Sequence, residues 1–72
     1  MVNVDKLRGK IVEKRMSAKS VANAIGIDAA TFYRKMNTNG DGFSIKEADM
    51  ISEILSLSLD EVNAIFFSQF VA

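Results

Sequence analysis

The sequence contains no cysteine, no histidine and no proline. Without cysteine, a disulfide framework and a thiolate metal site are excluded. Without histidine, the chain lacks the commonest general base and metal ligand, and no cluster of acidic residues marks a pocket. We therefore expect neither an enzyme nor a bound cofactor or metal. Because no apolar run approaches the roughly 20 residues of a membrane span and the N-terminus lacks a secretory signal, we expect a cytoplasmic protein without membrane contact.

The chain has 72 residues, of which 49% are hydrophobic and 25% are charged, an ordinary balance for a globular protein. This length suits one domain spanning residues 1–72. At this size only about 60% of the unfolded chain's surface is buried on folding. The core is therefore modest, and a partner would add to its stability.

Charges are unevenly distributed although the net charge is zero. Residues 1–37 carry eight cations against three anions, a net charge of +5. Residues 38–72 carry one cation against six anions, a net charge of −5. This asymmetry is expected of a module with one face toward phosphate. Chance clustering on solvated helix faces would produce the same split, so charge alone does not decide the function.

Residues 16–37 have the pattern of two short helices joined by a tight turn. Ser17 is placed to cap the first helix, and Gly26 to end it in a left-handed conformation. Asp28 follows as the cap of the second helix. The apolar residues at helical spacing, which we expect in the core, are Val21, Ala22, Ile25, Phe32 and Met36. Because the second helix leaves polar and cationic side chains outside, the stretch predicts a helix-turn-helix that fits a DNA major groove.

An amphipathic helix precedes this motif. Val4, Leu7 and Ile11 form its inward stripe, and we add Val12 to that face. Gly9 weakens the helix by roughly 1 kcal/mol relative to alanine. We interpret this glycine as a point where another helix approaches closely.

Two capping boxes open further helices after the motif. Ser44 is followed three residues later by Glu47, and Ser58 by Glu61. The expected inward residues of these two helices are Ala48, Ile51, Ile54, Leu55, Val62, Ile65 and Phe66. The five expected helices cover about residues 4–14, 18–25, 29–36, 45–55 and 59–67. With no proline and no alternating strand pattern, the sequence predicts an all-α bundle that contains a helix-turn-helix.

Several residues stand at positions that one known family shares. In and around the turn they are Ser17, Val21, Ala22, Ile25, Gly26, Ile27, Thr31, Phe32 and Arg34, and later the segment LSLSLDEV at residues 55–62. Over about residues 4–67 the chain thus resembles the lambda repressor and Cro-like helix-turn-helix family, also called the XRE type. Its apolar ending is similar to small repressors of Gram-positive phages and prophage-like elements. The resemblance implies a five-helix lambda repressor-like bundle that regulates transcription by sequence-specific binding of double-stranded DNA, with the third helix in the major groove.

The resemblance also implies two sets of DNA contacts. The positions expected to face base edges are Ala29, Ala30, Thr31, Tyr33 and Arg34. The positions expected to contact phosphate are Ser17, Lys19, Ser20, Lys35, Asn37, Thr38 and Lys46. Because alanine methyl groups donate no hydrogen bond, base discrimination rests mainly on the last three base-facing residues. Arg34 would give about 1–3 kcal/mol of discrimination if it binds guanine in bidentate fashion, and none if it binds phosphate only.

A competing motif lies at residues 37–48, where NTNGDGFSIKEA imitates a calcium loop of the EF-hand type. Asn39, Asp41 and Gly42 stand at ligand and turn positions of that loop. The departures from it are Asn37, Ser44 and Ala48. Ala48 replaces the bidentate glutamate, which removes two oxygen ligands and one charge. Since Asn-Gly and Asp-Gly also form ordinary turns, we interpret this segment as a loop between helices, with calcium binding as a remote alternative.

The C-terminus has more apolar residues than one inward face needs. Phe67, Phe70 and Val71 remain after the core is filled, and such a cluster predicts an interface. A two-fold homodimer would place two recognition helices about 34 Å apart on a near-palindromic operator. The alternative for the tail is that it folds back to complete the core. The alternative for the whole chain is a protein-interaction module that kept the fold without binding DNA.

Overall fold

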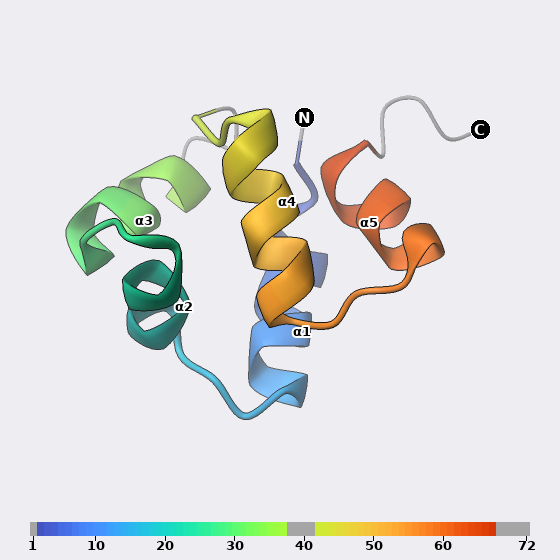
Figure 1. The fold of residues 1–72 in the computed structure, drawn as a ribbon, viewed down its shortest axis with the longest axis horizontal. Helices are drawn as coiled ribbons and strands as arrows, with labels where there is room; N and C mark the ends of the chain where they lie inside the picture. Colours follow the sequence, from blue (N-terminus) through green and yellow to red (C-terminus); the bar gives the residue numbers. More distant parts are fainter. Residues whose placement is uncertain (1, 38–41, 68–72) are drawn as a thin grey trace.

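A computed structural model describes residues 2–37 and 42–67, and these residues form five α-helices and no strand. The helices are α1 (Val4–Glu13), α2 (Ala18–Ile25), α3 (Ala29–Asn37), α4 (Ile45–Ile54) and α5 (Leu59–Phe66), as Figure 1 shows. Each helix begins at the expected residue, and no end differs from its expected position by more than one residue. None of these helices has the length and apolar character needed to cross a membrane. The prediction of an all-α fold is confirmed.

The helices are arranged around α4 and α1. In Figure 1, α2 and α3 lie on one side of α4 and α5 lies on the other. α2 packs against α1, α3 and α4, whereas α5 packs against α1. The amide of Asn3 also donates to the carbonyl oxygen of Ile65 over 2.7 Å, which ties the start of the chain to α5.

Serine residues cap three of the helices. In each case the serine hydroxyl accepts from the amide of the third helical residue, whose side chain in turn accepts from the serine amide. The pairs are Ser17–Ser20, Ser44–Glu47 and Ser58–Glu61. The last two were predicted from sequence. These reciprocal bonds satisfy amides that have no acceptor within the helix, which explains why the helix starts could be predicted.

Eleven buried apolar side chains, drawn from all five helices and the end of α4, form the core. They are Leu7, Ile11, Val21, Ala22, Ile25, Phe32, Met36, Ile51, Leu55, Ile65 and Phe66. All five core residues predicted for the helix-turn-helix are in this set. Phe32 has no exposed surface and meets Phe43 edge to face, with ring centroids 5.4 Å apart. Burial of such a ring contributes about 1.5–3 kcal/mol to folding, so the core fixes the position of α3.

Two expectations for α1 are wrong. Val12 is 72% exposed rather than inward, because one residue beyond Ile11 is a rotation of about 100° away from the buried stripe. A Cβ atom added at Gly9 would meet no atom within 4 Å. Another helix therefore does not approach this glycine closely.

Candidate nucleic-acid interface

The turn between α2 and α3 fixes how the two helices meet. Gly26 has a φ of +83°, which ends α2 in the left-handed conformation that glycine adopts without strain. The amide of Ile27 then donates to the carbonyl oxygen of Ala22 over 3.0 Å. The carboxylate of Asp28 accepts from the amide of Thr31 over 2.7 Å and so caps α3. Hydrogen bonds from the Thr31 amide and then its side chain lower the pKa of Asp28.

One face of α3 is exposed along its whole length. Its residues follow the i, i+3, i+4, i+7 spacing of a single helical face. This outer stripe of α3 consists of Ala30, Tyr33, Arg34 and Asn37. Phe32 and Met36 are buried on the opposite side. The core thus holds the helix from behind, and the outer stripe is the part of α3 that is open to a large ligand.

The outer stripe holds only part of the predicted base-facing set. Ala30, Tyr33 and Arg34 are exposed in it, whereas Ala29 and Thr31 are half-buried beside it. Asn37, which was predicted to contact phosphate, lies in the stripe one turn beyond Arg34. The sequence offered a signal for this placement, because residue 37 continues the helical spacing from 30, 33 and 34. The expected helix ended one residue too early to include it.

The N-terminus of α2 presents amide groups and one exposed cation. The hydroxyl of Ser17 accepts from the amide of Ser20 over 3.1 Å, and the hydroxyl of Ser20 accepts from the amide of Ser17 over 2.9 Å. Both hydroxyls therefore stabilise the helix start. The first amides, those of Ala18 and Lys19, have no acceptor inside a helix, and they lie at its positive end. Lys19 is exposed beside them.

Lys35 is half-buried between α3 and α4. Its amine donates to both carboxylate oxygens of Glu47, over 2.8 and 2.7 Å. Glu47 also accepts from the amide of Ser44 over 2.8 Å. Burial raises the pKa of Glu47, but the bonds from Lys35 and Ser44 outweigh burial and lower it. The phosphate contact predicted for Lys35 stays a prediction, and it would require an amine that already binds Glu47.

The remaining predicted phosphate positions and the calcium-like loop are only partly described. Lys46 is exposed at the start of α4. Thr38, Asn39 and Asp41 lie outside the described residues. Within residues 2–37 and 42–67, no group of three or more acidic side chains is placed to hold a metal ion.

Comparison with known proteins places this chain in a family. The family model described as the Cro/C1-type helix-turn-helix DNA-binding domain matches residues 6–67, which include all of the helix-turn-helix and most of the other helices. No curated protein and no solved structure matches the chain. The resemblance identified from sequence is confirmed. The chain belongs to the Cro/C1-type helix-turn-helix DNA-binding domains, and its function is DNA binding in the regulation of transcription.

Proposed function

We propose that this protein is a small phage-type repressor that binds a specific double-stranded DNA site with α3 in the major groove. The observation that carries the proposal is the outer stripe of α3, which runs the length of the helix with the buried Phe32 behind it. A major groove about 12 Å wide admits one helix and exposes a distinct pattern of donors and acceptors at each base pair. The groups of the outer stripe can recognise that pattern.

Base recognition rests mainly on the two residues of the outer stripe that lie nearest the C-terminus of α3. The guanidinium of Arg34 matches the two acceptors of guanine, and the amide of Asn37 matches the donor and acceptor of adenine. The two residues are spaced i, i+3 on one face of α3, so they would reach neighbouring base pairs. Ala30 has only a methyl group, which permits close approach and contact with a thymine methyl. Tyr33, the fourth residue of the outer stripe, is 49% exposed. Ala29 and Thr31, which are half-buried beside the outer stripe, are still proposed to face base edges.

Phosphate contacts would position the stripe. The amides of Ala18 and Lys19 offer donors at the positive end of α2, and the Lys19 amine adds a full charge. Ser17 and Ser20 would contribute through the helix start that they stabilise. On the other flank, Lys46 is exposed at the first turn of α4, and Lys46 and Thr38 are proposed to contact phosphate, whereas the amine of Lys35 is held by Glu47.

We also propose that two copies bind together. Ile45 and Leu59 are 82% and 74% exposed, and Phe67 is 38% exposed. All three line one hollow of about 300 Å³ between α4 and α5. Phe67 was predicted for a dimer interface, whereas Ile45 and Leu59 are added to the proposed interface here because of their exposure. A two-fold axis through this surface would pair two recognition helices on a near-palindromic operator. Phe70 and Val71, predicted for the same interface, lie outside the described residues.

Selection of bound duplexes from a random pool tests this function. We expect one enriched half-site, repeated as an inverted pair with centres about one helical turn apart. Arg34→Lys keeps the charge but loses the planar fork, so it should relax one base position while leaving non-specific affinity nearly unchanged. Arg34→Ala should relax the same position. Enrichment of no duplex at low salt would contradict DNA binding, and an enriched site without inverted symmetry would contradict the dimer alone.

A further inference from the structure

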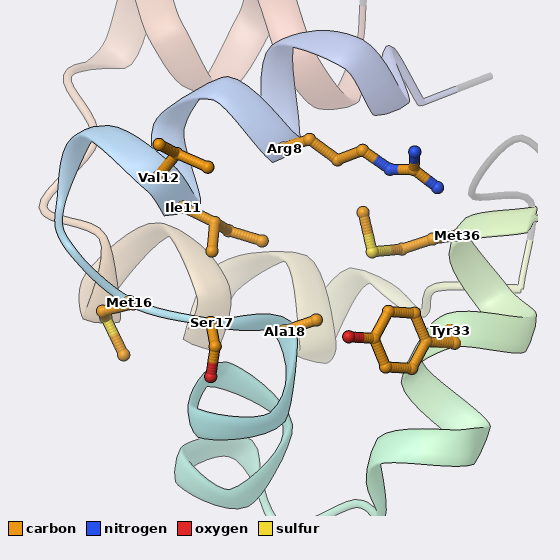
Figure 2. A pocket seen from close by; sticks show the side chains of 8 residues that line it. All are labelled: Arg8, Ile11, Val12, Met16, Ser17, Ala18, Tyr33 and Met36. Atoms are coloured by element: carbon orange, nitrogen blue, oxygen red, sulfur yellow. The ribbon is translucent and has the colours of Figure 1, made fainter.

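A second hollow lies between α1, the start of α2 and α3, and it shares Ser17, Ala18 and Tyr33 with the proposed DNA contacts. It encloses about 330 Å³, which is at the small end of ligand pockets. Its floor is apolar and includes Ile11 and Met36, which are 4% and 3% exposed, with Met16 at one side. Figure 2 shows Ile11 facing the space from α1 and Met36 facing it from α3, with Met16 on the connection to α2 at the edge. We call this space the α1–α3 pocket.

Polar groups occur only at the rim of the pocket. Arg8 extends from α1 toward α3, and the hydroxyl of Tyr33 points back toward the start of α2 (Figure 2). Ser17 adds a second hydroxyl. No acidic side chain lines the pocket. The ion pairs found among the described residues involve Lys10 and Lys35, so the guanidinium of Arg8 is not neutralised by any acid there.

We propose that the α1–α3 pocket binds a small amphipathic carboxylate, with one aromatic ring or one short branched chain. The apolar body would cover Ile11 and Met36, and the planar carboxylate would match the guanidinium fork of Arg8. Charge complementarity selects an anion, because the rim holds one cation and no acid. A DNA phosphate does not satisfy the site, since it carries no apolar group for the floor. A small carboxylate satisfies the rim and the floor together.

Occupancy of this pocket would be coupled to DNA binding, and this step rests on the proposed function. Tyr33 belongs to the outer stripe of α3, and Ser17 caps the helix whose first amides are proposed to meet phosphate. A carboxylate at this edge would engage Tyr33 and place a negative charge beside the phosphate path. The ligand should therefore weaken DNA binding, and DNA should weaken ligand binding by the same factor.

The chain contains natural reporters for a binding test without DNA. Tyr33 is its single tyrosine, and tryptophan is absent, so intrinsic fluorescence reports on the pocket rim. Among the methionines, Met16 and Met36 line the pocket, whereas Met50 packs against the core from α4 and serves as an internal control. The probes are 4-methylpentanoate and 3-phenylpropionate, each compared with its uncharged amide. Methyl resonances of labelled methionine and Tyr33 fluorescence are followed during titration.

We expect saturable shifts of Met16 and Met36, with Met50 unchanged, and amides that bind at least about tenfold more weakly than the carboxylates. Arg8→Gln should reduce carboxylate affinity to that of the amide. Lys6→Gln removes a cation from the same helix outside the pocket and should change nothing. The proposal is overturned by no saturable shift at millimolar probe, by equal affinity of acid and amide, or by undiminished carboxylate binding in Arg8→Gln. Pocket shifts that follow protein concentration alone would assign the site to a second copy and also overturn it.

A second arm separates this proposal from the proposed function. The carboxylate should lower the affinity of the native chain for its selected duplex and have no such effect on Arg8→Gln. If no duplex binds while the methionine shifts persist, the proposed function fails and the pocket stands. If a duplex binds and neither probe shifts the methionines, the pocket proposal fails and the proposed function stands.

Discussion

Two glycines of this chain have the same open surroundings but different backbone conformations. A Cβ atom added at Gly9 or at Gly26 would meet nothing within 4 Å, yet only Gly26 has a positive φ, of +83°. Gly9→Ala should therefore stabilise the fold by about 1 kcal/mol through helix propensity. Gly26→Ala should destabilise it by about 1–2 kcal/mol, because alanine is strained in the left-handed region. Urea denaturation measures both effects.

Because both substitutions add the same methyl group to open space, each is the control for the other. The two midpoints should move in opposite directions while the denaturant slopes stay equal. Destabilisation by Gly9→Ala would mean that α1 is not a regular helix at this position. Neutral behaviour of Gly26→Ala would mean that the turn between α2 and α3 tolerates another conformation.

Local signals made some residues predictable and left others unpredictable. Gly26 could be assigned to a left-handed turn because glycine is the usual residue there. Arg15 and Ser56 adopt the same region, with φ values of 58° and 52°, although their residue types do not favour it. Val12 lies about 100° around α1 from Ile11, and its apolar side chain suggested that the buried stripe is wide enough to include it. How wide the buried stripe is depends on how α1 meets its neighbours, which only the packed structure determines.

At the scale of elements, a cross-helix ion pair connects α1 and α5. Lys10 pairs with Glu61 and also lies 3.0 Å from the carboxylate of Glu13. Hydrogen bonds, first from Lys10 and then from the amide of Ser58, lower the pKa of Glu61 from 4.5 to about 2. The hydrogen bonds that Lys10 donates, first to Glu61 and then to Glu13, raise the pKa of Lys10 above 10.5. No local pattern in the sequence predicts a contact between such distant segments.

The lowered pKa gives this ion pair a defined pH range. Glu61 binds its proton more weakly in the folded than in the unfolded state, so its contribution is complete above pH 4.5 and is lost as pH falls toward about 2. The contribution of Lys10 is present below pH 10.5 and is lost at higher pH. Glu61→Gln keeps the cap on Ser58 but removes the charge. Its thermal midpoint should lie below that of the native chain at pH 7 and meet it near pH 2.

Asp60→Asn provides the comparison for that experiment, because it removes the neighbouring acid of α5 and leaves the Lys10–Glu61 pair intact. A difference between native chain and Glu61→Gln that stays constant from pH 7 to pH 2 would contradict the pairing. So would a pH dependence of the same size for Asp60→Asn.

A second cross-helix pair gives Lys35 a structural role that competes with its predicted DNA contact. The amine bridges α3 to the first turn of α4 through Glu47, and their side chains are only 21% and 14% exposed. Lys35→Gln should lower stability, since it leaves a half-buried carboxylate without its partner. We expect the salt dependence of DNA affinity to keep its slope. Loss of a phosphate contact would instead reduce that slope by about 0.9.

Glu47→Gln is the matched variant for Lys35, because it keeps the cap on Ser44 and removes only the ion pair. If Lys35 acts through Glu47, both variants should lower stability with little change in the salt slope. A slope that falls in Lys35→Gln but not in Glu47→Gln would assign the amine to phosphate.

The helices themselves were predictable because caps and periodicity are local, whereas both ion pairs depend on tertiary contact.

At the scale of the whole molecule, the charge split along the sequence overstates the positive charge that is available to DNA. Residues 1–37 carry a net charge of +5. Two of their cations, Lys10 and Lys35, are paired with acids of the second half across the fold. The positive potential must come from the other cations, such as the exposed Lys19 and Arg34. Part of the asymmetry thus holds the two halves together, which the sequence alone could not distinguish from an interaction surface.

The apolar hollow between α4 and α5 sets the expected assembly of the molecule. Leu59 is 74% exposed at its edge, so Leu59→Lys should leave the monomer folded and place charge in the proposed interface. Sedimentation equilibrium should show a dimer for the native chain and a monomer for this variant. Val12→Lys changes an equally exposed apolar residue on α1 and should remain dimeric. Because paired recognition helices share one operator, Leu59→Lys should lose affinity for the full inverted site but keep native affinity for an isolated half-site. A monomeric native chain, or a dimeric Leu59→Lys variant, would contradict the proposal that this surface is the dimer interface.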